Sequence, residues 1–262
     1  MRFRPCIDIH DGKVKQIVGG SLREESGRPK VQENFVAEQD AGYFAELYKK
    51  YGLTGGHVIL LNPRGTPEYE QDLAQAALAL KAYPGGLQIG GGVTSENAVE
   101  FIKMGASHVI VTSYVFENGR IRRDRLDKLR AAVGKEHLVL DLSCRKKEDS
   151  YYVVTDRWQK YTDSTVTPGL FGELSEFCDE FLVHGVDVEG KGSGIEEELV
   201  GILAEAADKM VITYAGGVRS EADIRKLRLL GQNKIDVTIG SALDLFGGEL
   251  PFEQAIGICG EE

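Results

Sequence analysis

A Gly-Gly-Val turn occurs twice in this chain, separated by nearly half of its length. Gly91-Gly92-Val93 is followed by Ser95-Glu96, and Gly216-Gly217-Val218 is followed by Ser220-Glu221. The offset between the two copies is 125 residues (216 − 91) and stays constant across the motif. A doubled half of this size predicts a quasi-two-fold molecule with equivalent sites on its two sides.

Two further pairs of segments follow the same division of the chain. Thr112-Ser113 comes after the first turn, and Gly240-Ser241 comes after the second. Ile7-Asp8-Ile9 matches Leu140-Asp141-Leu142, 133 residues later (141 − 8), so each half carries an acid inside an apolar β-type run. The matched pairs imply two anion sites and two carboxylates that face one another.

Short apolar runs alternate with helical patterns along the whole chain. The runs are continuous rather than alternating, which is typical of parallel strands buried on both faces; they are Phe3–Ile9, His57–Leu61, Leu87–Ile89, His108–Thr112, His137–Leu142, Phe181–Val186, Met210–Tyr214 and Ile235–Ile239. The stretches with apolar residues at helical spacing are Glu38–Tyr51, Glu68–Ala82, Glu96–Met104, Asp124–Val133, Pro168–Cys178, Glu196–Asp208 and Glu221–Leu230, with Ser95 and Ser220 as expected N-caps. The pattern predicts an α/β fold, a closed (β/α)8 TIM barrel with a half-barrel repeat, as a single domain over residues 1–262. A doubly wound open sheet is the alternative, but the eightfold count and the repeat favour the barrel.

Composition and charge exclude several classes of partner. The net charge of −10 and the pI of about 5.1 disfavour binding to nucleic acid or to an anionic membrane. No apolar run approaches the length of a membrane span, and polar residues near the N-terminus interrupt any signal-peptide core. The four cysteines show no paired spacing, so we expect reduced thiols, no zinc site and a cytoplasmic location. The acidic composition and the self-contained barrel favour a monomer.

Two connections are longer than a barrel requires. Val18–Asn34 follows the first strand. Ser143–Asp163 follows the fifth, and Tyr151–Thr155 within it is predicted to form one arm of a hairpin. Both follow strands, so both are expected at the carboxyl-terminal face, where barrel active sites form. Loops of this length are either functional lids or surface insertions, and their matched placement after the acid-bearing strands favours lids.

Asp8 and Asp141 are the strongest candidates for catalysis. A carboxylate within a buried-type strand loses hydration and needs a compensating role. One such acid alone would be interpreted as a structural ion pair. Strands one and five lie on opposite sides of an eight-stranded barrel, so the two acids would flank the pocket mouth, as a general base and a general acid should.

The small residues after strands three, four, seven and eight predict phosphate sites. Glycine lets the backbone approach an anion closely, and the next helix presents free N–H groups. The candidate residues are Gly91, Gly92, Thr112 and Ser113 on one side, and Gly216, Gly217, Gly240 and Ser241 on the other. Gly192, in the Gly190–Gly194 loop after strand six, would close over one phosphate or belong to a flexible linker. Two opposed sites imply a small-molecule substrate with a phosphate at each end.

Three other side chains have a structural and a functional interpretation. Asp187, at the end of strand six, would hold a ribose hydroxyl or orient a loop. His57 opens strand two, where a lone histidine is more often structural than catalytic. Trp158, the only tryptophan, would stack on a planar heterocycle or anchor its loop.

These features together resemble the histidine-biosynthesis barrels. The resemblance rests on Cys6–Val14, the two Gly-Gly-Val turns, Asp141 and the paired anion sites, and it covers essentially the whole chain. It is nearest to the isomerases that act on phosphoribosylformimino-5-aminoimidazole carboxamide ribotide; the segments Gly55–Ile59, Asp141–Arg145, Thr155–Lys160 and His184–Asp187 look like the branch found in fungi and plants.

The resemblance implies an Amadori rearrangement of an aminoaldose to an aminoketose, with no metal and no organic cofactor. By the same resemblance, Asp8 is the base that moves the C2 proton, and Asp141 is the acid that protonates the ring oxygen. The family has a stacking tryptophan in the strand-five loop and a histidine on strand two, which Trp158 and His57 match.

The sequence leaves two alternative functions to consider. The cyclase subunit of imidazole glycerol phosphate synthase has the same fold and acid pair, but it needs a charged gate at the bottom of the barrel, and Val58-Ile59-Leu60-Leu61 predicts an apolar interior. The second alternative is a phosphosugar-binding barrel without catalysis. It does not explain why both Asp8 and Asp141 are present.

Overall fold

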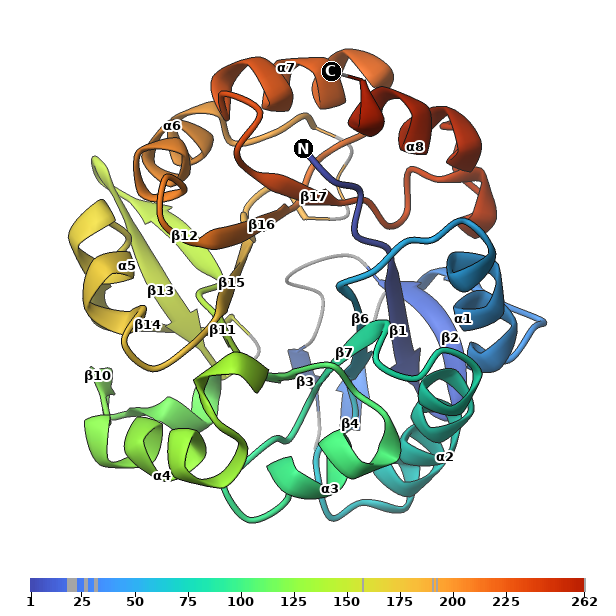
Figure 1. Ribbon diagram of the computed structural model, residues 1–262, viewed down its shortest axis with the longest axis horizontal. Coiled ribbons are helices and arrows are strands. Elements are labelled where there is room, and N and C mark those ends of the chain that lie inside the picture. The colour runs from blue at the N-terminus through green and yellow to red at the C-terminus, as the bar shows by residue number, and fades with distance from the viewer. Residues whose placement is uncertain are drawn as a thin grey trace.

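A ring of eight parallel strands forms the centre of the molecule (Figure 1). The computed structural model describes residues 1–17, 23–25, 28–30, 33–156, 158–189, 191 and 193–261. The ring strands are β1 (Cys6–His10), β6 (Gly56–Leu60), β7 (Leu87–Gly90), β8 (Val109–Val111), β11 (Leu138–Asp141), β15 (Glu180–His184), β16 (Val211–Ala215) and β17 (Asp236–Thr238). Phe3 pairs with Val237, and Arg4 N donates to Val237 O at 2.8 Å, which closes the ring between β17 and the segment before β1. The closed barrel is confirmed, and the open sheet is excluded.

In the described part of the chain, eight helices surround the strands (Figure 1). They are α1 (Ala41–Lys50), α2 (Pro67–Ala82), α3 (Ala98–Met104), α4 (Arg123–Val133), α5 (Pro168–Leu174), α6 (Glu197–Ala206), α7 (Glu221–Leu230) and α8 (Phe252–Gly260). Single turns of 3-10 helix, η1 (Ser113–Val115), η2 (Lys135–His137) and η3 (Asp244–Phe246), lie in the connections. Within the described part of the chain, none of the helices has the length and apolar character needed to span a bilayer.

Sequence patterns located most of these elements, with two local errors. Ser220 caps α7 as expected, because its side chain accepts from Asp223 N. The prediction for Ser95 is wrong: α3 begins after Asn97, and Ser95 Oγ instead bonds Tyr114 Oη at 2.7 Å. The sequence pattern also gave no signal for α8, whose Gly-interrupted FEQAIGICG segment lacks a side-chain N-cap.

The two long connections contain strands of their own. After β1 the chain turns back as β2 (Lys13–Ile17), which pairs with β5 (Glu33–Val36); β3 (Arg23–Glu25) and β4 (Arg28–Lys30) form a hairpin between them. After β11, β12 (Cys144–Lys147), β13 (Ser150–Thr155) and β14 (Lys160–Thr165) form an antiparallel sheet. The predicted hairpin arm is therefore confirmed and gains a third strand. A further short hairpin, β9 (Phe116–Glu117) with β10 (Arg120–Ile121), follows β8.

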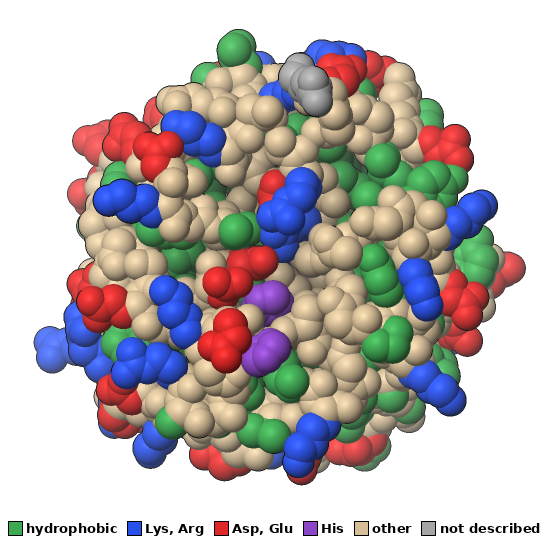
Figure 2. All heavy atoms as spheres, viewed as in Figure 1, with side chains coloured by type: hydrophobic (Ala, Val, Ile, Leu, Met, Phe, Trp, Pro, Cys, Tyr) green, Lys and Arg blue, Asp and Glu red, His purple; other side chains and the backbone are tan. Residues whose placement is uncertain are grey.

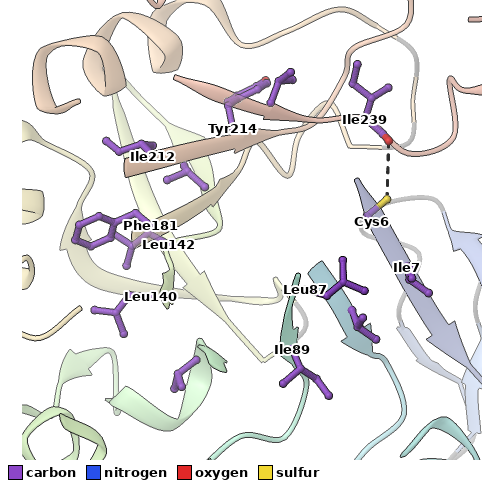
Figure 3. Packing of buried hydrophobic residues seen from close by; sticks show 14 of the residues in the cluster. Cys6, Ile7, Leu87, Ile89, Leu140, Leu142, Phe181, Ile212, Tyr214 and Ile239 are labelled. Atoms are coloured by element: carbon purple, nitrogen blue, oxygen red, sulfur yellow. Dashed lines mark hydrogen bonds between the residues drawn. The ribbon is translucent and has the colours of Figure 1, made fainter. Parts of the chain in front are cut away.

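The core is divided by the barrel wall into an inner and an outer cluster. The inner cluster is small and consists of Ile110, Val139, Leu182 and Ala215, with Ile59 packed against it. The outer cluster lies between strands and helices and includes the edge-on pair Phe171–Phe181, with ring centroids 5.0 Å apart. Figure 3 shows buried residues on several barrel strands, from Cys6 and Ile7 on β1 to Ile212 and Tyr214 on β16. All four cysteines are buried and unpaired.

The bottom of the barrel holds a charged network, so the prediction of an apolar interior there is wrong. Arg4, which is 1% exposed, donates from Nε to Asp236 at 2.7 Å and from Nη1 to Glu180 at 2.8 Å. Gln88 Nε2 donates to the same Glu180 carboxylate. These residues lie on the segment before β1 and on β7, β15 and β17. The prediction was based on an apolar run on β6, which does not determine the side chains that neighbouring strands direct into the barrel. The positive charge of Arg4 is therefore balanced within the network by two carboxylates, Asp236 and Glu180.

Candidate active site

Strand alternation brings Asp8, Asp141 and His184 to the barrel interior. On β15, Leu182 belongs to the inner cluster, so His184, two residues on, faces the same way. On β11 the same argument takes Val139 to Asp141. On β1, Ile7 and Ile9 are fully buried members of the outer cluster, which turns Asp8 inward. The two predicted catalytic acids therefore lie near the carboxyl ends of strands that enter the barrel from opposite halves of the chain.

The Asp8 carboxylate is held by one side chain and surrounded by charge. Gln16, on β2, donates from Nε2 to Asp8 Oδ2 at 3.3 Å. Burial and the nearby Glu189 carboxylate raise the pKa of Asp8 to about 7, while His184 and Gln16 oppose the rise. A carboxyl group that titrates near neutrality is suited to proton transfer at physiological pH.

Asp141 has a contrasting environment. Its Oδ1 accepts from Ser143 N at 2.8 Å and from Ser143 Oγ at 2.7 Å, and its Oδ2 accepts from Thr112 Oγ1 at 3.1 Å. His184 Nδ1 lies 3.6 Å from Oδ1. Burial alone would raise the pKa of Asp141, but His184, Ser143 and Thr112 together hold it below the usual value. Despite their matched sequence positions, the two acids therefore have pKa values shifted in opposite directions.

His184 connects Asp141 with two aromatic side chains. Burial alone would lower its pKa, but Asp141, Glu189 and Asp8 raise it to about 9, so the imidazole is protonated at neutral pH. His57 lies with its ring centroid 6.3 Å from that of His184, and burial and the His184 charge lower its pKa to about 3. Trp158 contacts His184 from the strand-five connection, with centroids 6.0 Å apart. Trp158 therefore lies beside the site, and His57 is a neutral group in the barrel interior.

Glu189 is a site residue that the sequence patterns did not single out. Its Oε2 is buried without a hydrogen-bond partner, and a Cβ on Gly216 would lie 3.2 Å from that atom. Burial raises its pKa, against the effect of His184. The residue follows β15 by five positions, where strand alternation no longer predicts direction, so only its nearness to the Gly190–Gly194 loop could have suggested it.

A cavity of about 430 Å³ joins Glu189 to the second Gly-Gly turn. It is lined by the predicted residues Gly216, Gly217, Gly240 and Ser241, and by the basic residues Lys191 and Arg219. Gly216 and Gly217 have φ of +123° and +72°, and a Cβ on Gly217 would lie 2.0 Å from Gly194 O, so this turn requires glycine. Gly192 lies outside the described residues.

The first Gly-Gly turn repeats this backbone geometry. Gly91 and Gly92 have φ of +102° and +67°, close to the values of their counterparts. After β8, the Thr112 hydroxyl donates to Asp141, and the predicted binding of a phosphate by Thr112 and Ser113 stays a prediction. Ser113 lines a separate cavity of about 420 Å³ with Asp156 and Lys160. The repeat thus holds in the backbone, while the polar side chains around it differ.

Asp187 lies in the loop-orienting position rather than in the cavity. Its Oδ1 accepts from Arg145 Nε at 2.9 Å and its Oδ2 from Lys146 N at 3.0 Å. Both carboxylate oxygens therefore attach β12 to the end of β15. The loop-orienting role expected for Asp187 is therefore confirmed, and its substrate-binding role stays a prediction.

Two groups of histidine and acidic side chains could offer metal ligands outside this site. Figure 2 shows one face of the molecule, with histidine side chains beside acidic ones near its centre. The groups are His10-Asp11-Glu33 and His108-Asp179-Glu180, with ligand atoms within 4.8 Å of one another. Lys15 bonds both Asp11 and Glu33, and Arg4 bonds Glu180, so side-chain cations already occupy most of these carboxylates.

Comparison with known protein families identifies the family of this chain. A family model described as "Histidine biosynthesis protein" matches residues 2–250. The chain belongs to this family. Within it, the chain is 52% identical over 259 residues to a chloroplastic isomerase of Medicago truncatula, covering 98% of this chain and 81% of the relative.

Two fungal members of the family are similar over nearly their full lengths. The Neurospora crassa protein is 47% identical over 252 residues (95% of this chain, 94% of the relative). The Saccharomyces cerevisiae protein is 42% identical over 255 residues (95% and 94%). All three are named 1-(5-phosphoribosyl)-5-((5-phosphoribosylamino)methylideneamino)imidazole-4-carboxamide isomerase. This family membership agrees with the resemblance to the fungal and plant branch.

Proposed function

We propose that this protein is the isomerase of histidine biosynthesis that converts this aminoaldose ribotide to the corresponding aminoketose. The observation that carries the proposal is the pair of inward-facing acids, Asp8 and Asp141, whose pKa values are shifted in opposite directions. The names of the three relatives support the same reaction. The conversion is an Amadori rearrangement, which moves protons within one substrate and involves no net oxidation.

The first step opens the furanose ring. A proton delivered to the ring oxygen breaks its bond to C1, and the nitrogen lone pair forms a Schiff base at that carbon. Asp141 is the group that faces the ring oxygen, and His184, protonated at neutral pH, supplies the proton through the contact between its Nδ1 and Asp141 Oδ1. The acid is thus the Asp141–His184 pair, with the proton stored on the imidazole.

The second step is the removal of the C2 proton by Asp8. Its raised pKa makes Asp8 a stronger base than an exposed aspartate, while a substantial fraction remains ionised at neutral pH. Loss of the C2 proton gives an enolamine, which tautomerises to the ketone as C1 gains a proton. Gln16, which bonds Asp8 Oδ2, is a positioning residue for this base.

Substrate binding uses both halves of the barrel. One phosphate lies in the cavity at Gly216, Gly217, Gly240 and Ser241, and the other lies at the Gly91-Gly92 turn. Trp158 stacks on the imidazole carboxamide, and the free Oε2 of Glu189 accepts from a sugar hydroxyl.

The test is a spectroscopic assay of the purified protein alone with the aminoaldose ribotide. We expect conversion to the ketose without ammonia, and we expect Asp8→Asn and Asp141→Asn each to lower kcat by about 100-fold or more. Asp8→Asn should still bind the ribotide, which separates catalysis from phosphosugar binding. Ammonia-dependent consumption of the ketose, without isomerisation of the aldose, would instead identify a cyclase.

A further inference from the structure

Arg64 differs from the other arginines whose side chains are described, because it forms no salt bridge with a carboxylate; from a longer distance, its charge contributes to the lowered pKa of Glu96. Among the arginines whose side chains the structure describes, it alone makes no ion pair with a carboxylate; the others are paired. Its side chain is exposed in the connection between β6 and α2. An unpaired guanidinium on a protein with a net charge of −10 is available for an anion from solution.

The Arg64 side chain lies against the first Gly-Gly turn. Its Nη1 donates to Thr94 Oγ1 at 3.3 Å. A Cβ on Gly92 would lie 3.2 Å from Arg64 Cβ, so little separates the arginine from the backbone that the turn exposes. A second side chain holds the turn, because Tyr69 Oη donates a hydrogen bond to Gly91 O at 3.2 Å. The cation and the glycine backbone therefore lie together at one edge of the barrel mouth.

The internal repeat shows what this arginine replaces. Arg219, which follows Gly216-Gly217-Val218 and lines the cavity at this second turn, corresponds to Thr94 at the same offset of 125 residues (219 − 94). The first half thus lacks an arginine at the position where the second half has one. Arg64 reaches that position from the neighbouring strand connection, by its hydrogen bond to the Thr94 hydroxyl.

The correspondence is structural as well as sequential. A Cβ on Gly91 would lie 2.2 Å from Leu60 O, and a Cβ on Gly216 would lie 2.8 Å from Gly185 O, again 125 residues apart (185 − 60). Both turns therefore pass against the end of the preceding strand in the same way. The two halves differ in where the positive charge originates, and each half has one beside its turn.

We propose that Arg64 binds the phosphate at the Gly91-Gly92 turn, and so supplies for one end of a bisphosphorylated substrate the charge that Arg219 and Lys191 supply for the other. This inference rests on the proposed function. A guanidinium forms two parallel hydrogen bonds with phosphate oxygens, which a threonine hydroxyl does not. Arg64 is therefore a specificity-determining residue that favours ligands with a phosphate at both ends.

The experiment measures binding by calorimetry in an Asp8→Asn background, which prevents turnover. Arg64→Gln is compared with Arg130→Gln, a loss of the same charge at the last turn of α4. The ligands are the aminoaldose ribotide and two analogues, each dephosphorylated at one end. We expect Arg64→Gln to weaken ribotide binding about 10- to 30-fold, as loss of a charge-assisted hydrogen bond does. Arg130→Gln should leave binding unchanged.

The two analogues identify the mechanism. The analogue that lacks the phosphate at the Gly91-Gly92 end should bind equally well with and without the Arg64 side chain, whereas the other analogue should be as sensitive as the ribotide. Equal weakening of all three ligands, or of none, would overturn the role of Arg64 while leaving the isomerase intact. Failure of the protein with Arg64 present to bind the ribotide would overturn the proposed function and this inference with it.

Discussion

His184 Nδ1 lies 3.6 Å from Asp141 Oδ1, so neighbouring strands β15 and β11 hold an imidazolium against a carboxylate at the barrel mouth. Together with the Glu189 and Asp8 charges, the contact raises the pKa of His184 to about 9 against the effect of burial, and it contributes to the lowered pKa of Asp141. On the other side of the mouth, Asp8 accepts from the neutral Gln16 amide and has a pKa of about 7. The site therefore separates its proton donor and its proton acceptor by environment.

The first prediction is a bell-shaped dependence of kcat/KM on pH. Asp8 acts as a base only when ionised, so activity should rise as pH increases through about 7. His184 supplies a proton only when protonated, so activity should fall as pH increases through about 9. The measurement is kcat/KM for the ribotide at closely spaced pH values. A profile that stays level between pH 5 and 8 would contradict the assignment of Asp8 as the base.

Glu189→Gln tests whether the Glu189 charge sets the pH at which the acidic limb lies. The Glu189 carboxylate raises the pKa of Asp8, so removing its charge should move the acidic limb to lower pH. His184 also loses a stabilising charge, so the basic limb should move down as well. A change in kcat with both limbs unmoved would show that Glu189 acts by contact alone.

The second prediction concerns the charged network at the bottom of the barrel. Arg4→Met leaves Glu180 buried without its cation and leaves Asp236 paired with Arg2 alone, and should lower the free energy of unfolding by about 3–5 kcal/mol. Arg2→Gln is the control, because Arg2 pairs with the same Asp236 but is 61% exposed, and should cost less than about 1 kcal/mol. Urea denaturation of the two variants gives both values. Equal losses would mean that burial does not govern the Arg4 pairs.

Sequence patterns predicted the framework of this molecule because the repeat and the strand periods are local signals. Residues 125 apart in the two Gly-Gly turns share positive φ values, as a shared motif requires. The acids on β1 and β11 face inward because strand alternation carries from one residue to the next.

Features that depend on contacts between distant segments were not predictable in this way. Glu189 and Arg64 follow strands in irregular connections, where no period fixes the direction of a side chain. The Arg4 network joins residues more than 170 positions apart, and the Thr112 hydroxyl donates to Asp141 on the neighbouring strand. Asp187 illustrates the limit, since only the position of β12 shows that its carboxylate is occupied.

The third prediction concerns Trp158, the only tryptophan of the chain. Loss of a base-stacking ring costs about 1–3 kcal/mol, so Trp158→Ala should raise KM for the ribotide by about 10-fold or more. Trp158→Phe retains a ring and should recover most of the affinity. Ligand binding should also change the intrinsic fluorescence of the protein, which comes mainly from this residue. A normal KM for Trp158→Ala would show that the indole only anchors its loop.

The fourth prediction separates two glycines by their surroundings. Gly217 has φ of +72°, and a Cβ there would lie 2.0 Å from Gly194 O, so Gly217→Ala must displace the turn that lines the cavity. We expect KM to rise by about 10-fold or more and the free energy of unfolding to fall by about 1–3 kcal/mol. Steady-state kinetics and urea denaturation measure the two effects.

Gly201→Ala is the matched control for this substitution. Gly201 lies within α6, and a Cβ there would meet no atom within 4 Å. Alanine has the higher helix propensity, so this variant should gain about 0.5–1 kcal/mol of stability with unchanged kinetics. If Gly217→Ala were as harmless as Gly201→Ala, the turn would tolerate a side chain, and close approach of its backbone to a phosphate could not be the reason for its glycine.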